Sequence, residues 1–220
     1  MQKMGFKRFI LASASPRRRQ LVSLLKIPFV AVAADVNEEI EEGERPQDMV
    51  CRLSLIKAKT IASAYAQGLI VAADTIVVLD GKVLGKPANE AEAMAMLQRL
   101  RGRQHTVFSG LTVLCSATGY TTTELVESTV SMRAYTDEEI EQYAASGDPL
   151  DKAGAYAIQH QSFRPVERIE GCYASVMGLP LCHLARELAR IGLTLPVDVA
   201  QACQSFTGHR CLVAGEILNG

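Results

Sequence analysis

Phe9-Ile-Leu-Ala-Ser13-Ala-Ser15-Pro16-Arg17-Arg18-Arg19 is the stretch of this chain that best defines its fold. The apolar run predicts a buried strand, and Pro16 predicts the first turn of a helix, because proline lacks the N–H that would be unpaired there. The three arginines then lie at the positive end of the helix dipole, where they repel one another unless an anion binds. Since helix N-termini and guanidinium groups both bind phosphate, we predict a phosphate-binding turn between this strand and this helix.

A solvated basic face is the alternative explanation of the arginine triplet. The hydroxyl groups of Ser13 and Ser15 favour phosphate binding, because they place further donors beside the charges. Consecutive helical residues point about 100° apart, so we expect one of the three arginines to face water.

The composition is that of an ordinary globular protein. Of 220 residues, 48% are hydrophobic and 21% are charged, which allows one large domain or two small lobes around a shared core. The net charge of −1 gives no basis for general attraction to nucleic acid or to a membrane surface. No apolar run approaches the roughly 20 residues of a membrane-spanning helix, and no signal peptide is recognisable. We therefore expect a cytoplasmic protein with neither a nucleic-acid nor a membrane partner.

The cysteine pattern also favours the cytoplasm. No two cysteines form a C-x-x-C pair, which argues against the usual zinc and thioredoxin sites. A core of this size does not need disulfides. We expect free, mostly buried thiols at six positions: Cys51, Cys115, Cys172, Cys182, Cys203 and Cys211.

Strand-like and helix-like segments alternate along the chain, which predicts an α/β fold with a long mixed sheet flanked by helices. Asp80-Gly81 between apolar runs predicts a hairpin turn. After Pro196 the periodicity weakens, and the pattern fits either an appended helix or a disordered tail. Strands are expected at 28–33, 69–79, 106–117, 121–133, 156–159 and 166–169, and helices at 48–65, 89–100, 136–145 and 181–190.

Asp74 interrupts the nearly continuous apolar run from Leu69 to Leu79. A carboxylate in such a run must be paired, bind a metal ion or lie at an open strand end, because burying it alone is too costly. A strand-end aspartate that accepts backbone hydrogen bonds is the structural alternative, and the run itself does not choose between them.

Other charged residues favour a functional role for Asp74. Lys57 lies on a predicted helix, Lys86 follows the hairpin in Gly85-Lys86-Pro87, and Glu38 lies in an acidic loop. Carboxylates that hold a divalent metal or activate water, with cations that stabilise phosphoryl oxygens, suit attack on a phosphoric anhydride. The chain has no G-x-x-x-x-G-K-[ST], G-x-G-x-x-G or G-x-S-x-G motif, which argues against P-loop enzymes, dehydrogenases and serine hydrolases.

Five short motifs together resemble the Maf family, and they occur in order between about residues 9 and 192. Each is weak alone, but five collinear motifs are highly specific. They are Leu-Ala-Ser-Ala-Ser-Pro-Arg-Arg (11–18), Ala-Asp-Thr-Ile-Val (73–77), Gly-Lys-Pro (85–87), Asp-Lys-Ala-Gly-Ala-Tyr-Ala-Ile-Gln (151–159) and Val-Met-Gly-Leu-Pro-Leu (176–181). We therefore expect a single catalytic domain over residues 1–195 and a C-terminal extension of undetermined structure over residues 196–220.

The resemblance implies a nucleoside triphosphate pyrophosphatase, which releases a nucleoside monophosphate and pyrophosphate with the help of Mg²⁺ or Mn²⁺. It also implies an inosine triphosphatase-like fold, with two lobes around a central cleft, and a cytoplasmic homodimer. Roles in removing modified nucleotides and in arresting cell division are further expectations from the family.

The resemblance also assigns roles to individual residues. Asp74 matches the proton acceptor and, with Glu38, a metal ligand, while Asn37 stands where the family often has an acidic residue. Positions that bind phosphate are matched by Ser13, Arg18, Lys57 and Lys86, to which Ser15 adds a neighbouring hydroxyl. Positions that set substrate specificity are matched by Arg17, Thr75 and Gln159.

The same residues indicate the branch of the family. Pro-Arg-Arg (16–18), Asp-Thr (74–75) and Gln159 resemble the branch that acts on dTTP and UTP. The branch that prefers 7-methyl-GTP carries Pro-Trp-Arg and Asp-Gln, and this chain contains no tryptophan to stack on a methylated purine. Two alternatives stay open: a regulator of septum formation that binds nucleotide without turnover, and a pyrophosphatase for another nucleotide such as 7-methyl-GTP.

Overall fold

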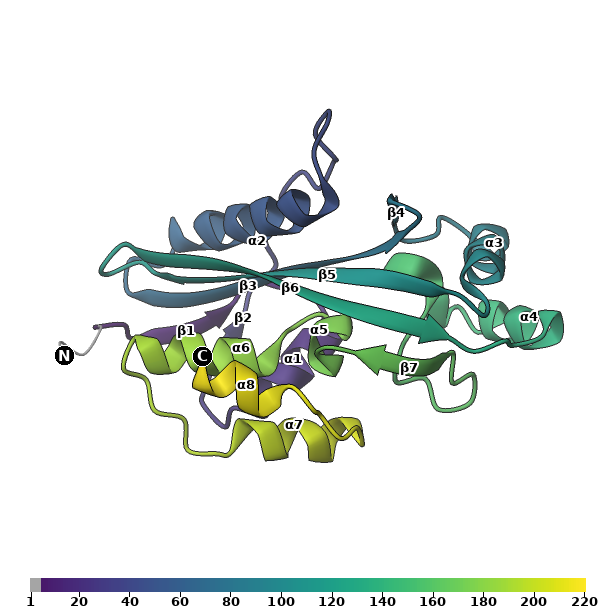
Figure 1. Ribbon diagram of the computed structural model, residues 1–220. Coiled ribbons are helices and arrows are strands. Elements are labelled where there is room, and N and C mark those ends of the chain that lie inside the picture. Colours follow the sequence, from purple (N-terminus) through teal and green to yellow (C-terminus); the bar gives the residue numbers. More distant parts are fainter. Residues whose placement is uncertain (1–4) are drawn as a thin grey trace.

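The computed structural model describes residues 5–220 as a strongly twisted mixed sheet with helices on both faces (Figure 1). The strand order is β2-β1-β3-β5-β6-β7, and β4 pairs with β3 alone. The first two pairings, of β1 with β2 and with β3, are parallel, and the others are antiparallel. The strands are β1 (Arg8–Leu11), β2 (Val30–Ala31), β3 (Gly68–Leu79), β4 (Lys82–Leu84), β5 (Gln104–Cys115), β6 (Tyr120–Met132) and β7 (Val166–Glu170).

The helices fall into three groups around the sheet (Figure 1). One face is covered by α2 (Pro46–Ala62), and α3 (Glu90–Leu100) and α4 (Asp137–Ala145) lie near one end. The opposite face carries α1 (Pro16–Ser23), α5 (Tyr173–Val176), α6 (Leu181–Arg190), α7 (Val199–Thr207) and α8 (Ala214–Asn219). This arrangement confirms the predicted α/β class and the long mixed sheet flanked by helices.

The central strand β3 is buried on both faces, and this explains its nearly continuous apolar sequence. Alternate residues of a strand point to opposite faces. Ile70, Ala72, Ile76 and Val78 pack on the side of α2, whereas the odd-numbered residues from 69 to 79, apart from Thr75, join the main core on the other side. Asp74 therefore belongs to the α2 face and Thr75 to the face that carries α1.

One edge of β3 is open in the middle. β1 pairs with β3 over residues 68–71, and β4 pairs with it over residues 77–79. Between these pairings, residues 72–76 of β3 have no strand beside them on that edge within residues 5–220. The chain leaves β1 at Leu11 and turns through Ser13 into α1, so the turn predicted to bind phosphate lies next to this open stretch.

The signals for the local structure are confirmed at most element boundaries. Asn89 caps α3, Thr136 and Glu139 form a reciprocal capping box at α4, and the Asp80-Gly81 turn joins β3 to β4 with positive φ angles of 52° and 73°. The strand predicted at 28–33 is shorter, since β2 has only two residues.

The strand predicted at 156–159 is wrong. Gly154 and Ala155 have positive φ angles of 71° and 59°, which turn the chain at the end of a 3-10 helix, η2 (Ala153–Ala155). Tyr156 and Ala157 are buried but have no strand partner among residues 5–220. Their polar groups bond to side chains instead: the Tyr156 hydroxyl contacts His105, and the Ala157 N–H donates to the Tyr143 hydroxyl. The apolar run is a core-facing loop.

Residues 196–220 include two helices that pack on the core, which decides between the two predicted possibilities in favour of appended helices. Val199, Cys203 and Ala214 are buried. Arg186 and Arg190 of α6 donate to the carbonyl oxygens of Ile217 and Gly220, at 3.2 and 2.9 Å.

The thiols are free, as predicted. Cys115, Cys172, Cys182 and Cys203 are buried, and Cys51 and Cys211 are half-buried. Within residues 5–220, no helix combines the length and the apolar character that crossing a membrane requires.

Candidate active site

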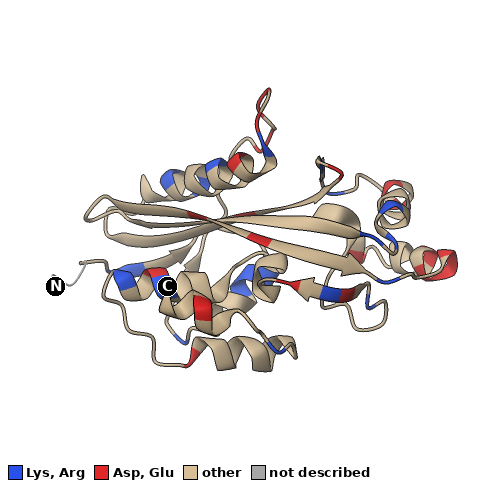
Figure 2. Cartoon of the chain, viewed as in Figure 1, with Lys and Arg blue, Asp and Glu red and all other residues tan. Residues whose placement is uncertain are grey.

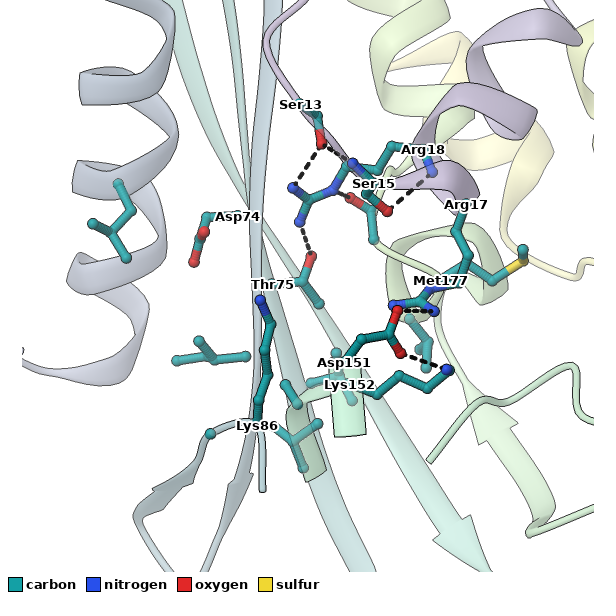
Figure 3. A pocket seen from close by; sticks show the side chains of 18 of the residues that line it. Ser13, Ser15, Arg17, Arg18, Asp74, Thr75, Lys86, Asp151, Lys152 and Met177 are labelled. Atoms are coloured by element: carbon teal, nitrogen blue, oxygen red, sulfur yellow. Dashed lines mark hydrogen bonds and ion pairs between the residues drawn. The ribbon is translucent and has the colours of Figure 1, made fainter. Parts of the chain in front are cut away.

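A cavity of about 560 Å³ lies at the open edge of β3. Its walls come from the turn before α1, from α2, from β3 and β4, and from residues on either side of η2 and α5. Because it surrounds a strand edge, it reaches both faces of the sheet. In Figure 3, Asp74 lies on one side of β3 and Thr75 on the other, beside Arg18.

The N-terminal turn of α1 forms one wall of the cavity. Ser15 is the N-cap, and its Oγ accepts from the Arg18 backbone N–H at 3.4 Å. The Ser15 N–H in turn donates to Ser13 Oγ at 3.1 Å, so the two serines fix the turn. Arg17 and Arg18 line the cavity, and Arg19 is exposed, which confirms that one of the three arginines faces water.

The Arg18 guanidinium is held on three sides inside the cavity. Its terminal nitrogens approach Ser13 Oγ at 3.4 Å and Thr75 Oγ1 at 3.5 Å (Figure 3). Its Nε donates to the Gly178 carbonyl oxygen at 2.7 Å. Burial lowers the pKa of Arg18, and the negative charges of Asp74 and Glu38 oppose this shift. The group stays cationic, so it presents a fixed positive charge to the cavity.

Asp74 and Glu38 share one cation. Lys57 Nζ lies 2.5 Å from Asp74 Oδ1 and 2.6 Å from Glu38 Oε1. Lys57 and Asp74 are buried, whereas the Glu38 side chain is 54% exposed. Burial opposes the ionisation of Glu38, but the hydrogen bond and charge of Lys57, with the charges of Lys86 and Arg18, lower its pKa overall. Glu38 is therefore a carboxylate at neutral pH.

Charge is distributed unevenly around this site. Basic residues lie on α1, and acidic residues follow one another along the loop that precedes α2 (Figure 2). Asn37 in that loop accepts from the Glu39 N–H at 3.0 Å and donates to the Glu39 carboxylate at 3.1 Å, so its amide serves the loop's own conformation.

The specificity candidates lie on the other wall. Arg17 forms a 3.7 Å ion pair with Asp151, whose carboxylate also accepts from Lys152 Nζ at 2.6 Å (Figure 3). Gln159 and Lys86 line the cavity with exposed side chains. All ten residues predicted for the site line this one cavity: Ser13, Ser15, Arg17, Arg18, Glu38, Lys57, Asp74, Thr75, Lys86 and Gln159.

Two groups that contact the cavity-lining side chains were not predicted from the sequence. Ser109 of β5 contacts Thr75, and the carbonyl oxygen of Gly178 accepts from Arg18. Ser109 is one of three hydroxyl residues in β5, with Thr106 and Thr112, so its residue type does not set it apart in the sequence. A backbone carbonyl carries no residue-specific signal at all.

The donor set fits a hard divalent cation. The carboxylates of Asp74 and Glu38 converge on one ammonium group at the cavity wall, and carboxylate oxygens are what Mg²⁺ and Mn²⁺ prefer. Over residues 5–220, no group of three or more His, Cys, Asp or Glu side chains is placed to hold a metal ion. A cation here would need further oxygen ligands, which phosphate groups supply.

The family model described as "Maf-like protein" matches residues 8–191. The chain belongs to the Maf family. The match spans every residue of the cavity wall described above, and it ends before α7 and α8.

Relatives of this Maf protein include two enzymes named dTTP/UTP pyrophosphatase from Dictyoglomus. The one from Dictyoglomus turgidum is 46% identical over 190 residues, which cover 86% of this chain and 98% of the relative. The one from Dictyoglomus thermophilum is 44% identical with the same coverage. A protein of the same name from Dehalococcoides mccartyi is 45% identical over 183 residues, covering 83% of this chain and 82% of the relative.

Proposed function

We propose that this protein hydrolyses dTTP and UTP between their α and β phosphates, releasing the nucleoside monophosphate and pyrophosphate. The main support for this proposal is the 2.5 Å contact between Lys57 and Asp74, which lies in the same cavity as the Arg18 guanidinium. It places a buried carboxylate beside the groups suited to a triphosphate. The printed names of the relatives support the substrate class.

Asp74 is suited to accept a proton from the attacking water. Lys57 engages its Oδ1, and within residues 5–220 no hydrogen bond involves its Oδ2. Oδ2 is therefore the oxygen that takes the proton as water attacks the anhydride and the bridging bond breaks. Arg18, Lys57 and Lys86 stabilise the negative charge that moves onto the phosphate oxygens.

A divalent cation belongs to this proposal, with Asp74 and Glu38 as its protein ligands and Mg²⁺ or Mn²⁺ as the ion. When bound, it supplies Lewis-acid polarisation of the phosphates. Lys57 keeps the two carboxylates together before substrate arrives, and the Ser13–Ser15 turn orients Arg18. The proposal also includes a homodimer in the cytoplasm, and light scattering after gel filtration tests the dimer. Finally, we propose a catalytic domain over residues 1–195, with residues 196–220 as an extension.

The test is pyrophosphate release from dTTP, UTP, CTP and 7-methyl-GTP with Mg²⁺ or Mn²⁺. We expect dTTP and UTP to have the highest kcat/KM, and Asp74→Asn to lower it by about 10²- to 10⁴-fold. Asp80→Asn is the matched control, because Asp80 follows the same strand in an exposed turn and pairs with Arg103. Failure to turn over any of the four nucleotides would refute the proposal, and a preference for 7-methyl-GTP would change its substrate. Nucleotide binding without turnover would favour a regulator.

A further inference from the structure

A row of buried hydroxyl groups leads from the cavity toward α5. Ser109 of β5 lies opposite Thr75 in the antiparallel pairing with β3, and its side chain is fully buried. Ser109 Oγ lies 2.8 Å from Thr75 Oγ1 and 2.9 Å from the Ser175 carbonyl oxygen. These contacts join the cavity wall to the helix that precedes Gly178.

The number of available hydrogens fixes the direction of these hydrogen bonds. A carbonyl oxygen only accepts, so Ser109 donates its single hydroxyl hydrogen to Ser175. In its contact with Thr75, Ser109 Oγ must then be the acceptor, and Thr75 donates. The one hydroxyl hydrogen of Thr75 therefore points away from the cavity.

This direction suits the neighbouring cation. The Arg18 guanidinium has donors only, so any partner must offer it a lone pair. Thr75 Oγ1, 3.5 Å from a terminal nitrogen of Arg18, offers lone pairs because its hydrogen is committed to Ser109. A hydroxyl turned the other way would place two positive hydrogens against each other. One of the three contacts that orient the guanidinium thus depends on a serine that does not itself line the cavity.

We propose that Ser109 is a positioning residue for Arg18: it fixes the Thr75 hydroxyl as an acceptor and so sets the direction in which the guanidinium faces phosphate. The assignment rests on the proposed function and deepens it, since it concerns the binding of the same triphosphate. It also makes Thr75 an acceptor, rather than a donor, toward anything bound beside it.

The first test replaces Ser109 by alanine. Without its acceptor, the Thr75 hydroxyl is free to rotate, and the Arg18 contact weakens. The KM for dTTP and for UTP should rise by the same factor, about threefold to tenfold, as expected for one lost hydrogen bond. The inhibition constant of pyrophosphate should rise by a similar factor, because Arg18 binds phosphate in both cases.

Ser128→Ala is the matched control. Ser128 is also buried, and its Oγ lies 2.9 Å from Ser175 Oγ, so it disturbs the same helix without reaching Thr75. We expect it to leave both constants within twofold of wild type. Equal changes in the two variants, or no change in pyrophosphate inhibition by Ser109→Ala, would overturn the assignment.

A double-mutant cycle tests whether Ser109 acts through Thr75. Thr75→Val removes the hydroxyl at nearly constant shape, and the Ser109→Ala/Thr75→Val double variant should be no worse than Thr75→Val alone. Independent, multiplying effects would contradict the relay. If the wild-type protein turns over no nucleotide, the proposed function fails separately, and calorimetric binding of pyrophosphate to the same variants tests the relay. No pyrophosphate binding by wild type would overturn both.

Discussion

Lys57 lies on the apolar stripe of α2 and ends 2.5 Å from Asp74 Oδ1, on the opposing strand β3. The same ammonium contacts Glu38 at 2.6 Å, so two carboxylates depend on one positive charge. A buried cation with two acidic partners is expensive to leave unpaired, and its removal would bring like charges together. The stability of this site therefore depends on the charges of Lys57, Asp74 and Glu38.

Lys57→Met should move the acid side of the pH profile. Burial opposes the ionisation of Glu38, but the hydrogen bond and charge of Lys57, with the charges of Lys86 and Arg18, hold its pKa below the ordinary value. The pKa should therefore rise when Lys57 is removed. Since the proposed function needs Glu38 as a carboxylate, the acid limb of kcat/KM should shift to higher pH, and kcat/KM at pH 7 should fall. Lys59→Met, an exposed lysine of the same helix, should leave the profile unchanged. An unchanged acid limb in Lys57→Met would contradict the assignment.

Gly110→Ala should destabilise the fold. An added Cβ would lie 2.2 Å from the Val50 carbonyl oxygen, because α2 packs directly on this point of β5. Neither the backbone of α2 nor that of β5 can move freely, so we expect the free energy of unfolding to fall by about 3 kcal/mol, the upper end of the range for overpacking. Gly110 pairs with Asp74 across the sheet, so displacement of α2 should also lower kcat.

The control for this substitution is Gly215→Ala in α8, where a Cβ meets open space. It should be neutral or slightly stabilising by about 0.5–1 kcal/mol. Denaturant unfolding of the two variants and the wild type makes the comparison, and equal stability of Gly110→Ala and wild type would refute the packing argument.

Some elements and site residues could be predicted from the sequence, and others could not. Asp74 is recognisable because a charge interrupts an apolar strand, and α1 because Pro16 and Ser15 mark its start. Lys57 carried a further signal, since it shares a helical stripe with Leu53 and Ile61. Residues 156–159 were predicted as a strand because an apolar run indicates burial. The run alone does not show whether the buried segment is a strand or a loop.

Thiol reactivity should separate the cysteines by burial. Burial, with smaller effects of neighbouring groups, raises the pKa of Cys172 and Cys182 to about 12 and that of Cys203 to about 11, so few thiolates form there at neutral pH. We expect an aromatic disulfide reagent to react with the two half-buried thiols, Cys51 and Cys211, in the native protein, and with the others only after unfolding. Cys51 should react more slowly than Cys211, because burial and the charge of Asp48 raise its pKa. Cys51→Ser and Cys211→Ser should each remove one reactive equivalent. A third reactive thiol in the native protein would contradict this.

Ending the chain after Leu195 should lower the melting temperature. Loss of α7 and α8 uncovers part of the core and leaves Arg186 and Arg190 without their carbonyl partners. A loss of a few kcal/mol corresponds to roughly 5–10 °C for a chain of this size. Leu212→Ser is the control, because Leu212 is 82% exposed and should leave the melting temperature unchanged. Calorimetry of the three proteins makes the measurement.

The unpaired stretch of β3 between β1 and β4 has a wider consequence. Asp74 and Thr75 follow one another in this strand, and their side chains leave it in opposite directions. Because the strand edge is open here, both are reached from a single cavity. Under the proposed function, substitutions around α1 and α5 can thus change how the phosphates are held while Asp74 and Lys57, anchored against α2, stay as they are. Substrate binding and bond cleavage would then be free to diverge independently during evolution.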